Sequence, residues 1–328
     1  MTDANTPDVT ESERPETSGE ALSVEDAVDV VTRIVDNVED VIIGQHEGVE
    51  HLVTALLADG HVLIEDVPGV GKTMLARSLA RSVDVEFTRV QFTPDLLPSD
   101  VTGVNVFNQK TREFEFQPGP LFGNIVLGDE INRAPPKTQS ALLEAMEERQ
   151  VTVDGDTHPV PEPFTVVATQ NTVEPNRTYE LPQAQLDRFM KKLHLGYPEQ
   201  AEESKLLARV AGDHPIRELE PVATGEELLA AQATAKTVAL SEPIREYATR
   251  LAAYTRDHAQ LGVSPRGSIA LLEASQARAL LEGREYVIPD DVQTEASTVL
   301  GHRVRLDGST GGSGTDVVEE ALRTVAVE

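Results

Sequence analysis

The stretch HVLIEDVPGVGKT, at residues 61–73, decides the fold class of this chain. A short apolar strand runs into a Gly-rich turn that ends in Gly71, Lys72 and Thr73, and apolar residues at helical spacing follow. In such a loop, backbone N–H groups surround phosphate oxygens, the lysine reaches the β- and γ-phosphates, and the threonine hydroxyl binds Mg²⁺. The sequence therefore predicts a site for ATP or GTP. The predicted nucleotide-binding residues of the loop are Pro68, Gly69, Val70, Gly71, Lys72, Thr73 and Met74.

One position departs from the usual pattern G-x-x-x-x-G-K-[ST], because Asp66 stands where the first glycine is expected. A bare Gly-Lys-Thr can arise by chance, so the prediction also depends on the strand before the loop and the helix after it. The departure removes no group that contacts phosphate or Mg²⁺, and we treat it as minor.

The charge balance of the chain is strongly acidic. Its 328 residues include 28 Lys+Arg against 56 Asp+Glu, which gives a formal charge of −28, and only seven of the cations are lysines. An acid-rich, lysine-poor surface suits very high salt, where screening removes the self-repulsion. We therefore expect a protein of a halophile's cytosol. An acidic protein that binds a basic partner is the alternative.

Several site classes are excluded by composition. The chain has no cysteine, which excludes disulfides, Cys-ligated zinc and thiol catalysis. The eight histidines lack His-Glu-x-x-His spacing, so any metal is expected to arrive with the nucleotide. The acidic, polar N-terminus has no secretory signal, and no apolar run approaches the length of a membrane span. The expected location is cytoplasmic.

Hydrophobic periodicity divides the chain into segments of different kind. We expect an acidic disordered tail at 1–22, an α/β core at 23–198, a linker at 199–224, a helical domain at 225–306 and a flexible C-terminal tail at 307–328, whose Gly/Ser linker precedes a short final helix. Ser23 is the predicted N-cap of the first helix. After the phosphate loop, strands are predicted at 86–92, 125–127, 164–168 and 192–195. Alternation with helices predicts a mostly parallel sheet covered on both faces.

Two insertions interrupt this alternation. Residues 101–116 and 151–160 each have the pattern of a β-hairpin, and Asp154-Gly155 is a favoured type I′ turn in the second.

The strand at 125–127 leads into two acids, Asp129 and Glu130. Asp129 at the carboxyl end of a parallel strand can hold Mg²⁺ through water, and Glu130 can polarise the attacking water. The alternative is a strand followed by ordinary surface acids, which the presence of the phosphate loop disfavours. Thr73 and Asp129 are thus the predicted metal ligands.

Three longer motifs resemble those of MoxR-type AAA+ ATPases: DEINRAPPKTQSALLEAMEE at 129–148, ATQN at 168–171 and LPQAQLDRF at 181–189. The resemblance covers about residues 25–305. It implies an AAA+ P-loop core, with a five-stranded parallel sheet, helices on both faces and two β-hairpin insertions, plus a smaller all-α lid domain. It also implies ATP and Mg²⁺ as cofactors.

The resemblance implies roles for further residues. Asn171 matches the sensor-1 position, on the strand between the phosphate-loop strand and the Asp129 strand, although an Asn at a strand end is often only a turn former. Arg188 matches the arginine finger that reaches a neighbouring subunit's nucleotide; an arginine paired with surface acids is the alternative. Gln45 matches a position near the adenine. The implied catalytic residues are Lys72, Glu130, Asn171 and Arg188.

Arg266 can also be argued from the residues alone. Ser264-Pro265-Arg266 opens a helix, which places a cation at the positive end of the helix dipole unless an anion offsets it. ATP phosphate is the natural anion, and the family's sensor-2 arginine has this Ser-Pro-Arg context. For Arg133, a nucleotide role and an interface salt bridge remain open.

The resemblance implies an Mg²⁺-dependent ATPase that forms a homo-oligomeric, hexameric ring and remodels a client protein, in some cases with a protein that has a von Willebrand factor A domain. The alternatives are a nucleotide-dependent scaffold without turnover and a nucleic-acid translocase of the MCM type. With so few lysines there is no basic stripe for phosphates, so nucleic acid is not an expected partner.

Overall fold

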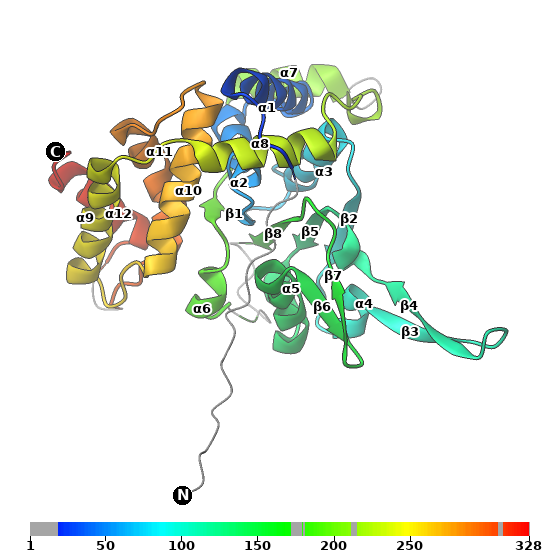
Figure 1. Ribbon diagram of the computed structural model, residues 1–328. Coiled ribbons are helices and arrows are strands. Elements are labelled where there is room, and N and C mark those ends of the chain that lie inside the picture. The colour runs from blue at the N-terminus through cyan, green and yellow to red at the C-terminus, as the bar shows by residue number, and fades with distance from the viewer. Residues whose placement is uncertain (1–18, 172–178, 180, 211–214, 308–310, 328) are drawn as a thin grey trace, which may run out of the picture.

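A five-stranded parallel sheet lies at the centre of the structure, with strand order β2-β5-β8-β1-β9 (Figure 1). Its strands are β1 (Val62–Asp66), β2 (Phe87–Gln91), β5 (Ile125–Asp129), β8 (Thr165–Asn171) and β9 (Lys191–Leu193). The predicted strands are confirmed with shifted ends, and β8 lies between β1 and β5. The register of β1 with β8 pairs Asp66 with Asn171, and the register of β2 with β5 pairs Gln91 with Asp129. The polar strand ends are therefore brought to one edge of the sheet.

The computed structural model describes residues 19–171, 179, 181–210, 215–307 and 311–327. Its helices are α1 (Val24–Glu39), α2 (His46–Leu57), α3 (Lys72–Ser82), α4 (Pro98–Thr102), α5 (Pro136–Glu148), α6 (Gln183–Leu186), α7 (Gln200–Val210), α8 (Gly225–Thr237), α9 (Glu242–His258), α10 (Pro265–Leu281), α11 (Pro289–Leu300) and α12 (Gly314–Thr324). Ser23 caps α1 as predicted, because its hydroxyl accepts the Asp26 N–H at 3.1 Å. The predicted disordered tail falls largely outside the described residues.

Both faces of the sheet are buried, as expected for parallel strands. Alternate strand residues enter two separate apolar clusters. Val62 and Ile64 pack with side chains of α1, α2 and α3, whereas Leu63 packs with side chains of α5 on the opposite face. The predicted α/β core with helices on both faces is confirmed.

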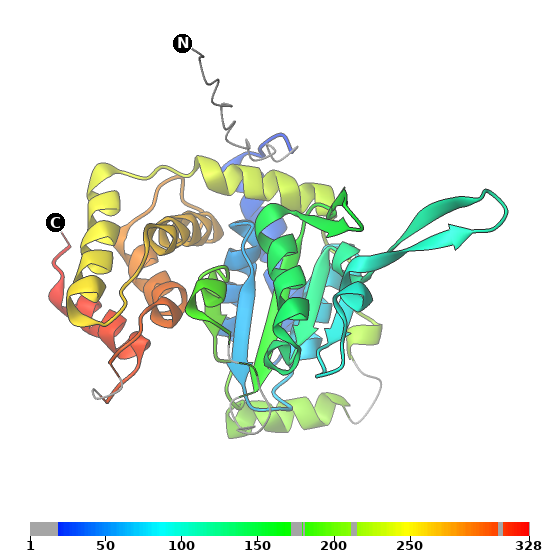
Figure 2. The same cartoon turned by 90° about the horizontal axis from the view of Figure 1, so that it is seen from below.

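Two β-hairpins extend from the core. The first pairs β3 (Gly103–Asn108) with β4 (Glu113–Pro118) and projects far from the sheet (Figure 2). It begins two residues later than predicted, because Val101 and Thr102 close α4. The second pairs β6 (Gln150–Val153) with β7 (Asp156–Pro159). Asp154 and Gly155 have φ of 54° and 96°, which agrees with the predicted turn.

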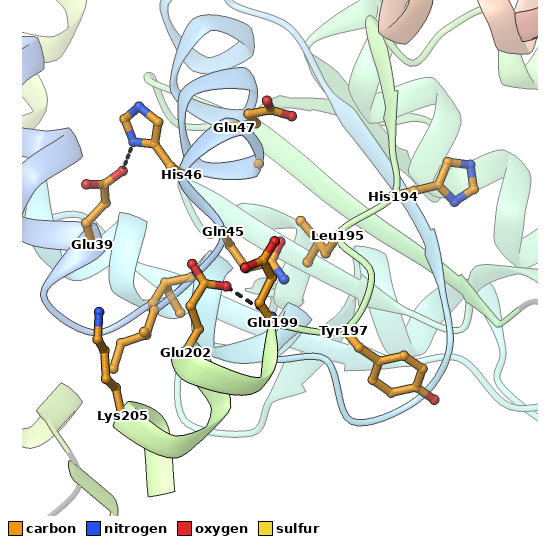
Figure 3. Close-up of a pocket in the computed structure, with 14 residues that line it drawn as sticks. Glu39, Gln45, His46, Glu47, His194, Leu195, Tyr197, Glu199, Glu202 and Lys205 are labelled. Atoms are coloured by element: carbon orange, nitrogen blue, oxygen red, sulfur yellow. Dashed lines mark hydrogen bonds and ion pairs between the residues drawn. The ribbon is translucent and has the colours of Figure 1, made fainter. Parts of the chain in front are cut away.

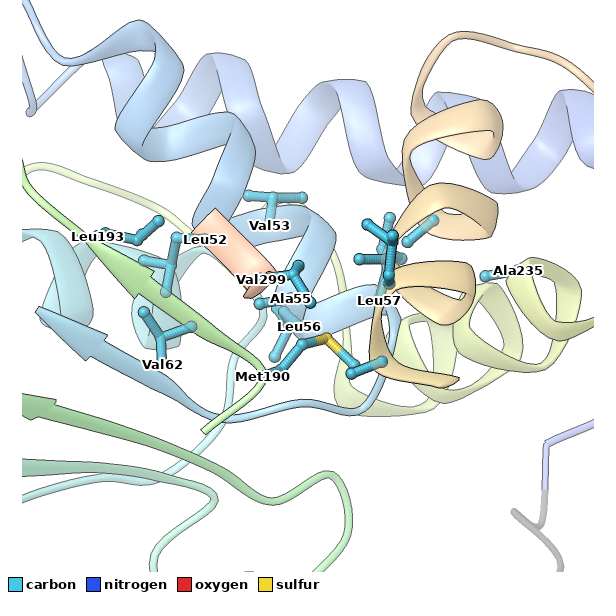
Figure 4. Close-up of a cluster of buried hydrophobic side chains, with 14 of the residues drawn as sticks. Leu52, Val53, Ala55, Leu56, Leu57, Val62, Met190, Leu193, Ala235 and Val299 are labelled. Carbon is cyan, nitrogen blue, oxygen red and sulfur yellow. The ribbon is translucent and has the colours of Figure 1, made fainter. Parts of the chain in front are cut away.

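Helices α8 to α12 form a lid, and this lid shares an apolar cluster with the core. Leu56 and Leu57 of α2, Met190 beside β9, Ala235 of α8 and Val299 of α11 meet in this cluster (Figure 4). The Gln232 amide of α8 also donates to the Leu56 carbonyl at 2.7 Å. Because buried apolar packing crosses the boundary, the lid is held against the core by more than a linker.

Two predicted boundaries need correction. The predicted linker at 199–224 contains α7. The short final helix predicted after the Gly/Ser stretch is α12, but it is not part of a flexible tail, because Val317, Val318 and Ala321 are buried against the other lid helices. Apolar residues at helical spacing outweigh the Gly/Ser stretch before them. Within the described residues, no helix is long and apolar enough to cross a membrane.

Candidate functional site

The phosphate loop connects β1 to α3 and presents an open cradle. Gly69 and Gly71 have φ of 90° and 95°, a region that side chains rarely adopt, and a Cβ on either would meet nothing within 4 Å. The space beside both glycines can therefore hold another group. Lys72 and Thr73 begin α3, whose N-terminal N–H groups and dipole favour an anion. Pro68, Val70 and Met74 lie in the same loop and first turn.

Lys72 is buried, and its contacts are to neutral oxygens. Its ammonium donates to the Asp66 carbonyl at 3.0 Å and to the Asn171 side-chain oxygen at 3.3 Å. Burial lowers the pKa of Lys72, and the nearby carboxylates of Asp66, Asp129 and Glu130 oppose that shift. Its charge is therefore held at the loop, in the position where phosphate oxygens would enter.

Asn171 joins Lys72 to Glu130. The Asn171 amide nitrogen donates to one Glu130 carboxylate oxygen at 2.6 Å, while its oxygen accepts from Lys72. The other Glu130 oxygen accepts from Gln91 at 2.9 Å and pairs with Arg133 at 2.8 Å. Glu130 itself has φ of 58°, a left-handed conformation that is unusual outside glycine and typical of functional sites. The structure thus brings three predicted catalytic residues together.

Asp129, the predicted metal ligand, lies at the end of β5. One of its oxygens accepts the Thr169 hydroxyl at 2.7 Å, and the other pairs with Arg89 at 2.6 Å. These partners fix the orientation of the carboxylate at the same sheet edge as the phosphate loop. Donor chemistry at this edge fits Mg²⁺, which takes hydroxyl and carboxylate oxygens together with phosphates and water.

Sequence reasoning missed Arg89 and Gln91 of β2. Their spacing of two residues, at the end of a strand next to the Asp129 strand, places both side chains on one face. That alternation was the available signal. For Arg133, the structure gives an ion pair with Glu130 of its own chain.

Arg188 and Arg266 lie together, although they are far apart in sequence. Glu147, near the end of α5, pairs with Arg188 Nε at 2.9 Å and also with the Arg266 guanidinium. Asp187 accepts the hydroxyl of Ser264, the N-cap of the Arg266 helix, at 3.2 Å. No contact among the described residues joins either arginine to Lys72.

These contacts bear on both predictions for the arginines. Sequence reasoning expects an anion beside Arg266, and in the isolated chain Glu147 is that anion. Arg188 is likewise paired with an acid, which was the alternative to a finger role. Both guanidiniums are partly exposed, so they can exchange Glu147 for an anion outside the chain. The finger and sensor roles remain predictions.

A pocket of about 760 Å³ opens between the α1–α2 connection and the segment after β9 (Figure 3). Ile42, Ile43, Gln45, Leu195 and Tyr197 are among its lining residues. Gln45 donates through its amide to the Gly196 carbonyl at 3.3 Å. Its apolar side chains and the Gln45 amide suit a heterocyclic base, and much of the remaining lining carries charged or polar groups: four glutamates, two histidines and Lys205. Gln45 thus lines a pocket, and its place beside an adenine remains a prediction of the family resemblance.

The chain is similar to known proteins in both of its parts. Residues 61–191 match the model of the ATPase family associated with various cellular activities (AAA), and residues 251–321 match an AAA lid domain. The chain is 52% identical over 308 residues to the uncharacterized protein YeaC of Bacillus subtilis, covering 92% of this chain and 96% of that protein. It is 40% identical over 329 residues to the chaperone MoxR1 of Mycobacterium tuberculosis, covering 96% of this chain and 86% of that one.

The fold of the chain also matches that of a solved structure. The crystal structure of a proposed ATPase from Cytophaga hutchinsonii matches with a TM-score of 0.87 and 36% identity, covering 93% of this chain and 97% of that one. The two family models match successive parts of the chain, and the relatives and the solved structure cover nearly all of it. The chain therefore belongs to the MoxR family of AAA+ ATPases.

Proposed function

We propose that this chain hydrolyses ATP with Mg²⁺. The observation that carries the proposal is the connected series Lys72–Asn171–Glu130 beside an open glycine cradle. Lys72 binds the β- and γ-phosphates, Glu130 polarises the attacking water, and Asn171 holds both side chains in register. Mg²⁺ that arrives with the nucleotide would neutralise phosphate charge, and Thr73 and Asp129 would hold it.

The contacts of Glu130 bear on how it can activate water. Glu130 is engaged by Asn171, Arg133 and Gln91 in the isolated chain, so both of its oxygens are already hydrogen-bonded. The Glu130 oxygen that accepts from Asn171 has a second lone pair, through which it can still accept a proton from water. Nucleotide entry, which brings negative charge to Lys72 and Arg133, supplies a reason for these contacts to rearrange.

Arg188 and Arg266 support an arrangement in which subunits complete one another's sites. Their guanidiniums share Glu147 and make no contact with Lys72 among the described residues. A ring, hexameric by family resemblance, would place the Arg188 of one subunit against the phosphates of the next, and Arg266 would contact nucleotide phosphate. Turnover in that ring would drive the remodelling of a client protein in the cytoplasm. A protein with a von Willebrand factor A domain is the proposed partner.

The first test is release of phosphate from ATP by the full chain in multimolar KCl. We expect Mg²⁺-dependent turnover that Lys72→Ala abolishes together with ATP binding, because the loop loses its cation. Lys110→Ala, in the turn of the projecting hairpin, is the matched control and should keep the parent rate. A Lys72→Ala protein that hydrolyses ATP like the parent would remove the proposed site.

The client is tested by affinity capture from the native host's lysate in high salt. Glu130→Gln should bind ATP and stall, which lengthens the life of the client complex. Recovery of a protein with a von Willebrand factor A domain supports the remodelling function. Recovery of DNA would favour the translocase alternative.

A further inference from the structure

Asp66 stands where the phosphate-loop pattern has its first glycine, and it is almost fully buried, with 7% exposure. Its carboxylate accepts backbone N–H groups from two separate segments. One oxygen accepts from Val67 at 2.8 Å, and the other accepts from both Leu195 and Gly196 at 2.7 Å. Hydrogen bonds to a charged group are stronger than neutral ones, so these three bonds hold the two segments firmly to Asp66.

The two ends of Asp66 serve different parts of the nucleotide site. Its backbone carbonyl accepts from the Lys72 ammonium at 3.0 Å, next to the phosphate cradle. Its side chain binds Leu195 and Gly196, and Gly196 in turn accepts from Gln45 in the wall of the large pocket. One residue therefore connects the phosphate loop to the pocket that suits a base.

Backbone pairing does not make this connection. The register between β1 and β9 runs from Val62↔Lys191 to Ile64↔Leu193, whereas β1 itself continues to Asp66. Beyond Leu193, the Asp66 side chain holds Leu195 and Gly196 to β1 through their backbone N–H groups, and Glu65 makes a longer side-chain pair with His194 at 3.7 Å. Asp66 is an extended strand residue, so no left-handed conformation requires a glycine there. A glycine at this position would leave the Leu195 and Gly196 N–H groups without that acceptor.

We propose that Asp66 is a positioning residue that fixes the wall of the base pocket against the phosphate loop, so that base and triphosphate bind as one unit. This inference rests on the proposed nucleotide binding. It predicts that restoring the usual glycine makes the site worse. The alternative, a tolerated replacement of glycine with no role, predicts no change or an improvement.

The test compares the affinities of the full-length parent and Asp66→Gly for MgATP and for Mg-tripolyphosphate, which lacks base and ribose, by calorimetry in multimolar KCl. We expect Asp66→Gly to bind MgATP about tenfold to a hundredfold more weakly, since it loses charged hydrogen bonds to the pocket wall. Tripolyphosphate affinity should stay near that of the parent. Asp66→Asn, which keeps the side-chain volume and one acceptor oxygen, should lose less and guards against a folding defect in the glycine variant.

The matched control is Glu65→Gln. Glu65 is the neighbour of Asp66 on β1. It pairs with Lys192 of β9 at 2.5 Å and, at 3.7 Å, with His194 just after β9, but it accepts from neither Leu195 nor Gly196, whose N–H groups bind Asp66. It should leave both affinities nearly unchanged. Equal weakening of both ligands in Asp66→Gly, or parent-like binding of MgATP, would overturn the inference. A parent that binds neither ligand would instead defeat the proposed function, and the inference with it.

Discussion

Two buried lysines, Lys72 and Lys191, have opposite surroundings. Lys191 on β9 is fully buried and pairs with Glu295 of α11 at 2.6 Å. The Glu295 carboxylate also binds Arg278 of α10 at 2.9 Å, so the cluster joins the core sheet to the lid. Lys72 has 8% exposure, and its hydrogen bonds among the described residues go to a backbone carbonyl and an amide oxygen.

The pKa shifts express the same difference. Burial lowers the pKa of Lys191 to about 8 against the pull of Glu295. Burial alone would raise the pKa of Glu295, but Lys191, His51 and Arg278 together hold it below its usual range. Charges in that cluster neutralise one another. The carboxylates of Asp66, Asp129 and Glu130 act on Lys72 from nearby, but its hydrogen bonds within the described part of the chain go to neutral oxygens, as suits a lysine that binds phosphate.

The largest effect we predict concerns the arginines beside Glu147. Arg188→Ala should leave the ATP affinity of the isolated subunit nearly intact and lower turnover by about 10³–10⁵, because a finger acts on transition-state charge. Mixing Arg188→Ala with Lys72→Ala subunits, each inactive alone, should restore some phosphate release. Intact ATP sites would then adjoin neighbours that retain Arg188.

Sedimentation must show that the two variants co-assemble. If mixed assemblies form and stay inactive, Arg188 acts within its own subunit or only holds an interface. In the second case, the pair of Arg188 with Glu147 would belong with the structural ion pairs, like that of Lys191 with Glu295.

The next effect is on stability. Glu295→Ala should lower the free energy of unfolding by about 3–5 kcal/mol, because it leaves buried cations without their partner. Glu319→Ala, which removes an exposed pair with Arg323, should change it by less than about 1 kcal/mol. Denaturant unfolding of both variants measures the difference. Similar losses in the two would show that the buried cluster has no special role in holding the lid.

The smallest effect is that of salt. A charge of −28 with few lysines predicts a melting temperature that rises from low to multimolar KCl, since screening weakens repulsion among exposed acids. The buried cluster is screened much less, so the gap between the parent and Glu295→Ala should persist in high salt. A melting temperature of the parent that does not rise would remove the halophile interpretation.

Much of the fold could be predicted because its signals are local. The glycine turn, the strand before Asp129 and the Asp154-Gly155 hairpin each depend on a few neighbouring residues. The contacts of Arg188 and Arg266 with Glu147 could not be predicted, because Arg188 reaches α5 from the segment before β9 and Arg266 reaches it from α10 of the lid. The same holds for Lys191 and Glu295, which are separated by about a hundred residues and meet only once the lid packs on β9.

Asp66 shows a second limit. In the sequence, Asp66 is only a departure from the glycine of the phosphate-loop pattern. That it accepts from Leu195 and Gly196 is known only from the path of the chain after β9. Asn171, by contrast, lies where the strand order and the motif together placed it, between Lys72 and Glu130. Motif reasoning located the groups that meet at one sheet edge and missed those that join distant segments.

The central claim is that Lys72 holds the nucleotide while Glu130 activates water. The most direct test measures ATP affinity and phosphate release for Glu130→Gln beside the parent in multimolar KCl with Mg²⁺. We expect parent-like ATP affinity and no steady-state turnover, because the glutamine amide can keep the contact with Asn171 but cannot accept a proton from water. Hydrolysis by Glu130→Gln at the parent rate would contradict the assignment of the base.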